Sequence, residues 1–145
     1  MPKQTIFLGA DHAGYALKER TKAWLSSHGF DVRDLSPRLR AGDDYPKHGF
    51  AVARRVAKTK GSRGVLVCGS GVGVSIAANR IKGARAFDAY DTRTVKLARE
   101  HNDANIIALS GWHTPAAKAK KLVRIFLSTK FSAAQRHLRR VKQLG

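Results

Sequence analysis

The sequence has 145 residues, 43% of them hydrophobic, which is enough for the core of a single domain spanning residues 1–145. Because 28 Lys and Arg face only 10 Asp and Glu, the formal charge is +18, and we expect an anionic partner: nucleic acid or a small phosphorylated ligand. The opening apolar run TIFLGA is too short for a secretion signal or a membrane span, and one cysteine cannot form an internal disulfide, so a cytoplasmic protein without membrane contact is expected.

Five apolar runs have the length of β-strands, and helical patterns separate them. In chain order we expect a strand at 5–8, a helix at 13–28, a strand at 30–35, a helix from 46, a strand at 65–68, a helix at 74–81, a strand at 84–89, a helix from 92, a strand at 106–109, and helices at 115–129 and from about 132. This alternation predicts an α/β fold, a three-layer sandwich with a five-stranded parallel, Rossmann-like sheet between helices, plus a C-terminal helix.

Polar residues follow the first and third predicted strands. For the common strand order 2-1-3-4-5, ligands bind in the crevice beyond the carboxyl ends of these two strands. The first strand runs into Asp11 and His12, and the third runs into Cys68 and the glycine-rich stretch 69–73. The topology therefore predicts one pocket that contains Asp11, His12 and Cys68.

The glycine-rich stretch does not fit a nucleotide-binding motif. Val74 stands where a dinucleotide fingerprint needs its third glycine, and no G-K-[ST] of a P-loop follows. The glycines fit either a tight turn with no ligand or an oxyanion site made of bare N–H groups at a helix start. The same helix start favours the thiolate form of Cys68, although a lone cysteine at a strand end is often an inert apolar residue.

The histidines divide into surface positions and candidate functional positions. His28, His48 and His113 are expected in loops or on helix surfaces, whereas His12 follows a strand and His101 ends a helix just before the fifth strand. No H-x3-H or C-x2-C spacing occurs, so we predict no metal site.

Five stretches carry a resemblance to a known family: GADHAGYALKE (9–19), DYP (44–46), VCGSGVGVSIAANR (67–80), GARAF (83–87) and AREHNDANIIAL (98–109). They resemble the type B ribose-5-phosphate isomerases, relatives of the galactose-6-phosphate isomerase subunits. The resemblance implies an aldose–ketose isomerase that interconverts ribose 5-phosphate and ribulose 5-phosphate through an enediolate in the pentose phosphate pathway, with no metal or organic cofactor. It also implies a homodimer, or a dimer of dimers, with shared active sites.

The resemblance further implies roles for individual residues. Cys68 matches the base that abstracts the substrate proton, and His101 matches the residue that assists opening of the furanose ring. Ser70 lies in the loop that holds the enediolate, where a hydroxyl is placed to relay a proton between two substrate oxygens. The positions expected to bind substrate are Asp11, His12, Tyr45, Gly69, Ser70, Gly71, Val72, Gly73, Asn102, Arg136, His137 and Arg140, with the two arginines as phosphate clamps.

Departures from the family pattern lie near the phosphate end. Trp112 stands in place of an arginine, FSAAQRH (131–137) replaces F-E-G-G-R-H, and Asp88 begins a stretch without the usual Cys-His pair. An isomerase of a six-carbon sugar phosphate, such as allose or galactose 6-phosphate, therefore remains an alternative. A basic nucleic-acid-binding protein on an inactive isomerase scaffold is a second alternative.

Overall fold

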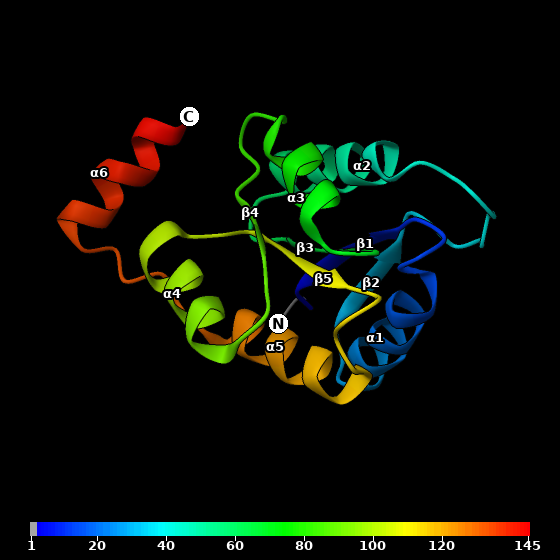
Figure 1. The fold of residues 1–145 in the computed structure, drawn as a ribbon. Coiled ribbons are helices and arrows are strands. Elements are labelled where there is room, and N and C mark those ends of the chain that lie inside the picture. The colour runs from blue at the N-terminus through cyan, green and yellow to red at the C-terminus, as the bar shows by residue number, and fades with distance from the viewer. Residues whose placement is uncertain (1–2) are drawn as a thin grey trace.

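The structure, a computed structural model, describes residues 3–145 and contains one five-stranded parallel sheet (Figure 1). The strand order is β2-β1-β3-β5-β4. The strands are β1 (Thr5–Ala10), β2 (Asp31–Asp34), β3 (Arg63–Cys68), β4 (Ala86–Asp88) and β5 (Ile106–Ser110). The predicted α/β fold with a parallel sheet is confirmed, and each strand lies within two residues of its expected range.

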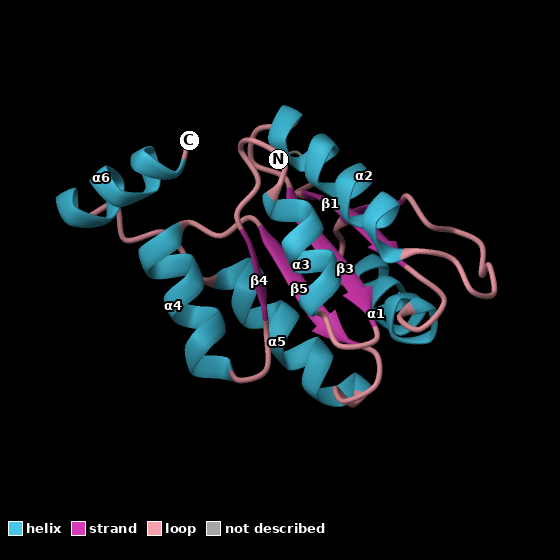
Figure 2. Cartoon of the chain, turned by 45° about the horizontal axis from the view of Figure 1, so that its top comes forward, coloured by secondary structure: helices cyan, strands magenta, loops and turns pink. Residues whose placement is uncertain are grey.

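Helices cover both faces of the sheet, as Figure 2 shows. They are α1 (Tyr15–Ser27), α2 (Tyr45–Lys58), α3 (Val72–Asn79), α4 (Thr92–Asn102), α5 (Ala116–Ser128) and α6 (Gln135–Leu144). Because side chains alternate along a strand, Ile6 and Leu8 pack against α1, α4 and α5, while Phe7 packs against α2 and α3. Within residues 3–145, no helix has the length and apolar character needed to cross a bilayer.

The expected strand order 2-1-3-4-5 is wrong at its end, because β5 lies between β3 and β4. All five residues of β5 are buried, whereas β4 has only three residues, and each is half-buried. A strand buried on both faces needs a neighbour on each side, so β5 takes the inner place and β4 forms the edge. This order places the end of β5 beside Cys68, with Cys68 paired to Ser110.

Three helices begin two or three residues from the expected start, the first of them α1, at Tyr15 rather than residue 13. α3 begins at Val72 rather than Val74, because Gly71 adopts the left-handed conformation with φ of 85° and forms the N-cap. α6 begins at Gln135, and it projects from the body of the molecule beside α4 (Figure 1). Its apolar residues Leu138 and Leu144 are exposed.

A buried ion pair joins α1 to the end of β2. Lys18 has no exposed side-chain surface, and its Nζ donates to Asp34 Oδ2 at 2.8 Å and also to Glu19. Lys22 donates to the same Asp34 oxygen at 3.0 Å. Burial would raise the pKa of Asp34, but hydrogen bonds from Lys18, Lys22 and the Ser36 N–H outweigh it, so the pKa is lowered. The carboxylate therefore stabilises the folded state while it is ionised.

We predict that Asp34→Asn lowers the free energy of unfolding by about 1.5–3 kcal/mol at neutral pH, because the buried Lys18 ammonium loses a charge-assisted hydrogen bond and keeps only Glu19 as its charge partner. The pKa of Asp34 is lower in the folded chain than in the unfolded chain, so its contribution is present above about pH 4 and is lost as the pH falls. Urea denaturation at several pH values should show a weaker acid dependence for the variant. Asp31→Asn, at a half-exposed carboxylate paired with Arg33, is the control, and an equal loss in both variants would contradict the prediction.

Candidate active site

A pocket of about 450 Å³ lies beyond the carboxyl ends of β1, β3 and β5. Seven of the predicted site residues line it: Asp11, His12, Tyr45, Cys68, Gly69, Ser70 and Gly73. Gly71 and Val72 belong to the same loop without lining the pocket. The structure therefore brings Asp11, His12 and Cys68 together, as the topology predicts.

Cys68 is the last residue of β3, and 4% of its surface is exposed. The N–H of Gly71 donates to its Sγ at 3.2 Å. An N–H group directed at sulfur stabilises negative charge on that atom, and so does the start of α3 directly after it. This arrangement suits a cysteine that abstracts a proton.

Each of the three glycines after Cys68 makes room for a particular side chain. A Cβ atom at Gly69 would lie 2.4 Å from the Trp112 ring, and one at Gly73 would lie 2.7 Å from the Tyr45 ring. At Gly71, the Cβ would lie 2.3 Å from Asp88 Oδ1. The glycines therefore allow side chains from other elements to approach the loop, in addition to baring its N–H groups.

Loop N–H groups remain available at the start of α3. The N–H of Val72 donates to Ser70 Oγ at 3.1 Å, and that of Gly71 is directed at the sulfur. The N–H groups of Gly73 and Val74 lie in the first turn, where a helix offers no acceptor of its own. Gly73 lines the pocket, so its N–H is placed to meet an anion beside Cys68, whereas Val74 is fully buried.

The turn after β1 presents Asp11 and His12 to the pocket. Asp11 is buried, and its Oδ1 accepts the N–H of Gly14 at 3.0 Å. The His12 N–H donates to Asp43 Oδ1 at 2.8 Å, and its ring Nδ1 lies 3.2 Å from the Asp43 carbonyl oxygen. Asp43 also lines the pocket and was missed by the sequence analysis, since nothing in the stretch GDDYP indicates which acid meets His12.

Trp112 and Asp88 are the other unexpected neighbours of the loop. The Trp112 side chain lines the pocket while remaining largely exposed. The backbone N–H of Trp112 donates to the Gly69 carbonyl at 3.1 Å, which fixes the turn after β5 beside the glycine loop. Burial raises the pKa of Asp88, whose carboxyl faces Gly71. If the sequence analysis had placed β5 next to β3, it would also have placed Trp112, which follows β5, beside the glycine loop.

The remaining predicted site residues lie elsewhere in this chain. None of the five lines the pocket: His101, Asn102, Arg136, His137 and Arg140. α4 runs antiparallel to the strands, so its last residues, which include His101, lie at the amino ends of the strands. Cys68 lies at the opposite, carboxyl ends. The structure therefore divides the predicted site residues into two groups.

The second group is organised around a histidine pair. The rings of His101 on α4 and His137 on α6 have centroids 4.3 Å apart, and His137 Nδ1 lies 2.5 Å from Ser132 Oγ. Burial lowers the pKa of His137, and the charges of His101, Arg136 and Arg140 lower it further. Arg136 and Arg140 are exposed on either side of this pair. In residues 3–145 no three metal-ligating side chains are grouped.

Comparisons with known proteins give a consistent result. A family model described as Ribose/Galactose Isomerase matches residues 6–144. Ribose-5-phosphate isomerase B of Mycobacterium tuberculosis (strain ATCC 25618 / H37Rv) is 43% identical over 146 residues, which cover 100% of this chain and 90% of that protein. The crystal structure of ribose-5-phosphate isomerase B from Mycoplasma genitalium with bound ribulose-5-phosphate is similar with a TM-score of 0.93 and 38% identity, covering 99% of this chain and 95% of that one. Ribose 5-phosphate isomerase B from Anaplasma phagocytophilum has a TM-score of 0.93 and 38% identity, covering 100% and 99% of the two chains.

We predict that Gly71→Ala destabilises the chain more than Gly29→Ala. Both glycines have nearly the same left-handed φ, 85° and 84°, so each substitution incurs a conformational cost of about 1–2 kcal/mol. A Cβ at Gly29 meets nothing within 4 Å, whereas one at Gly71 meets Asp88 and Leu109. Overpacking should add about 1–3 kcal/mol at Gly71. Urea denaturation measures both variants, and equal losses would show that the loop tolerates a side chain facing Asp88.

Proposed function

This chain belongs to the ribose/galactose isomerase family, and we propose that it interconverts ribose 5-phosphate and ribulose 5-phosphate. Membership of the family confirms the resemblance seen in the sequence, and it makes the chain an aldose–ketose isomerase of sugar phosphates. The observation that carries the choice of reaction is Cys68, which lines the pocket with Asp11, His12 and Gly73 and accepts the N–H of Gly71 at its sulfur. As part of this proposal, the enzyme serves the pentose phosphate pathway in the cytoplasm.

Cys68 acts as the base in the proposed mechanism. In the open-chain aldose, the thiolate removes the proton from C2, and the electron pair of that C–H bond forms the C1–C2 double bond of an enediolate. The same sulfur returns the proton to C1, so the carbonyl moves from C1 to C2. One positioned base is sufficient, because C1 and C2 are adjacent and the proton leaves and returns on one side.

The loop stabilises the charge that develops on the enediolate oxygens. The first-turn N–H of Gly73 is a fixed donor on the pocket wall near Cys68, and a fixed donor stabilises an oxyanion without reorganising during the reaction. Ser70 is exposed in the same loop, so its hydroxyl can pass a proton between the oxygens on C1 and C2. Asp11, His12 and Tyr45 bind the hydroxyl groups of the sugar from the facing wall of the pocket.

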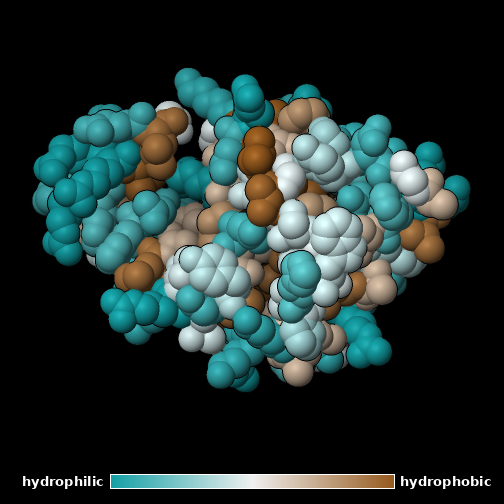
Figure 3. All heavy atoms as spheres, viewed as in Figure 1, coloured by the Kyte–Doolittle hydropathy of each residue, from teal (hydrophilic) through white to brown (hydrophobic). Residues whose placement is uncertain are grey.

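The second group of site residues acts in the active site of a partner chain, as part of a homodimer. In the proposed dimer, His101 assists ring opening, Asn102 and His137 contribute to substrate binding, and Arg136 and Arg140 clamp the phosphate. Two observations support this arrangement. The first is that the two groups lie at opposite ends of the strands of one sheet. The second is that apolar side chains are exposed on α3 and α6, namely Val72, Ile76, Leu138 and Leu144. Figure 3 shows such apolar atoms on the face that carries these helices.

Trp112 closes the pocket next to Gly69 in place of the expected arginine. Losing one charge-assisted phosphate contact costs about 1.5–3 kcal/mol, so Arg136 and Arg140 of the partner carry the phosphate contact in this proposal. The large indole also limits the room beyond the glycine loop, which favours a five-carbon sugar over a six-carbon one.

We predict that the purified chain converts ribose 5-phosphate and that Cys68→Ala lowers kcat by at least about 100-fold, because the base is removed. Binding of a competitive sugar-phosphate inhibitor should remain measurable in the variant, since the pocket walls are intact. Activity within tenfold of the wild type would show that Cys68 is not the base. A higher kcat/KM on allose or galactose 6-phosphate would overturn the choice of substrate.

Mixing two inactive variants tests the shared site. Cys68→Ala and His101→Asn each damage a different half of every active site in a homodimer of a single variant. A mixed dimer contains one site in which both residues are intact, so co-expression should restore about a quarter of the wild-type sites if subunits pair at random. Absence of recovery, with mixed dimers demonstrated by differential tags, would contradict a shared site.

A further inference from the structure

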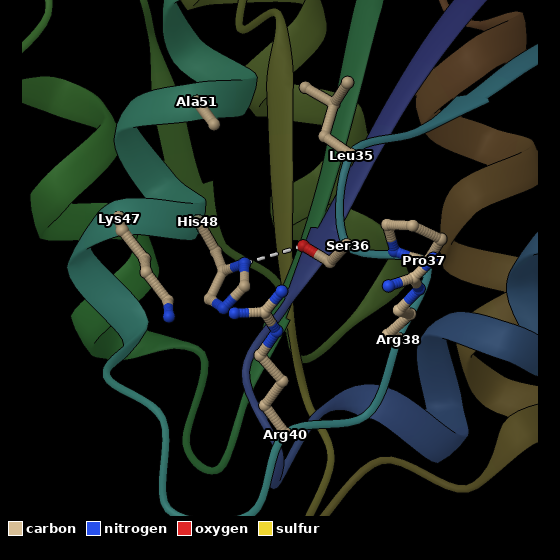
Figure 4. A pocket seen from close by; sticks show the side chains of 8 residues that line it. All are labelled: Leu35, Ser36, Pro37, Arg38, Arg40, Lys47, His48 and Ala51. Carbon is tan, nitrogen blue, oxygen red and sulfur yellow. Dashed lines mark hydrogen bonds between the residues drawn. The ribbon is translucent and has the colours of Figure 1, made fainter.

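His48 does not lie on the surface of α2, as the sequence suggested, but makes two short hydrogen bonds in the interior. Its imidazole is 12% exposed. Its Nδ1 lies 2.6 Å from Ser36 Oγ, and its Nε2 lies 2.7 Å from Asp43 Oδ2 (Figure 4 shows the Ser36 contact). One side chain therefore joins Ser36, the second residue after β2, to the loop before α2.

Both ends of this connection return to the turn after β1. Ser36 Oγ accepts the N–H of Ala10 at 3.1 Å. Asp43 Oδ1 accepts the N–H of His12 at 2.8 Å. The hydrogen bonds therefore form a closed circuit from residue 10 to residue 12, and the residue enclosed between these two attachment points is Asp11. Asp11 and His12 are the two residues that β1 contributes to the pocket.

The protons of the circuit can be assigned. An ionised carboxylate only accepts, so His48 Nε2 carries the proton that it donates to Asp43. In the neutral imidazole, Nδ1 then accepts from the Ser36 hydroxyl, which leaves a lone pair of Ser36 for the Ala10 N–H. Burial would raise the pKa of Asp43, but the hydrogen bonds from His48 and His12 outweigh it, and the pKa is lowered. Every group in the circuit thus has a partner.

The outer side of His48 lines a separate cavity of about 450 Å³. Figure 4 shows Arg40 beside its ring, Lys47 on the other side and Arg38 next to Pro37, and no acidic residue lines this cavity. The imidazole therefore stands between the cavity and the Asp43 carboxylate. Without it, water from the cavity can reach Asp43, and a hydrated carboxylate holds the His12 N–H less firmly.

We propose that His48 is a positioning residue: it fixes Asp43, Asp43 fixes the backbone and ring of His12, and the turn that carries Asp11 and His12 is thereby held against the pocket. The hydrogen bonds among His48, Asp43 and His12 do not depend on the proposed function, whereas the consequence for substrate affinity rests on it. His48 does not line the active-site pocket, so it acts through Asp43. Its loss should raise KM much more than it lowers kcat.

The experiment compares His48→Gln with His48→Asn. The amide nitrogen of glutamine reaches the place of Nε2 and can still donate to Asp43, whereas the amide of asparagine reaches only the place of Nδ1, on the Ser36 side. The contact with Asp43 is the one that transmits the effect, so His48→Gln should keep KM within about threefold of the wild-type value. His48→Asn and His48→Ala should raise KM at least about tenfold, because each loses a hydrogen bond to a charged group. His28→Asn, at an exposed histidine at the end of α1, is the matched control and should leave KM unchanged.

Amide hydrogen exchange provides a readout that needs no turnover. Exchange at the His12 N–H should be at least about tenfold faster in His48→Asn and His48→Ala than in the wild type, but not in His48→Gln, while exchange at buried core residues such as Val67 stays the same. Equal behaviour of the glutamine and asparagine variants, or unchanged exchange at His12, would overturn the proposal. If the wild type does not turn over ribose 5-phosphate, the proposed function fails, and the exchange at His12 still decides the positioning role.

Discussion

Hydrogen bonding on both sides of β3 is the constraint on which the rest of the site depends. β3 pairs with β1 on one side and β5 on the other, and its residues from Gly64 to Cys68 are buried. Cys68 therefore has one possible position, between the turn that follows Ala10 and the turn that follows Ser110. The N–H of Gly111 donates to the Cys68 carbonyl at 2.8 Å and locks the second turn in place. The strand fixes the Cys68 backbone, and the Gly71 N–H then needs only to meet the sulfur.

The same parallel sheet keeps the two groups of predicted site residues apart within one chain. In each strand–helix unit the helix runs back toward the amino ends of the strands. Residues that follow strands therefore gather at the carboxyl ends of the strands, and residues that end helices gather at the amino ends. Cys68 follows a strand, and His101 ends a helix. Their separation is a property of the topology, and no side-chain movement removes it. An enzyme that uses both residues on one substrate must bring the carboxyl ends of the strands in one chain close to the amino ends in another. For this reason we propose a shared site.

The sequence predicts the fold and the centre of the site well because both depend on local patterns. Apolar runs of strand length mark the strands, and the rule for parallel sheets places Asp11, His12 and Cys68 together. The exchange of β4 and β5 was not predicted, because strand order depends on which run is buried on both faces. The partnership of His48 with Ser36 and Asp43 was not predicted either. These residues are brought together by the path of the loop between β2 and α2, and a loop path has no periodic signal in the sequence.

The high positive charge surrounds several carboxylates with more than one basic side chain. With 28 basic residues against 10 acidic ones, three carboxylates with little or partial exposure each receive at least two basic side chains, and Asp43 also has Lys47 as a third at 3.9 Å. Lys18 and Lys22 bind Asp34, His12 and His48 bind Asp43, and Arg85 and Arg99 bind Asp103. These three carboxylates therefore join different segments of the fold, and within residues 3–145 most of the other Lys and Arg side chains lie at the surface and form no ion pair. An unpaired positive surface attracts phosphorylated sugars over a range of about one Debye length, so the charge that suggested nucleic acid is equally suited to collecting a small anionic substrate.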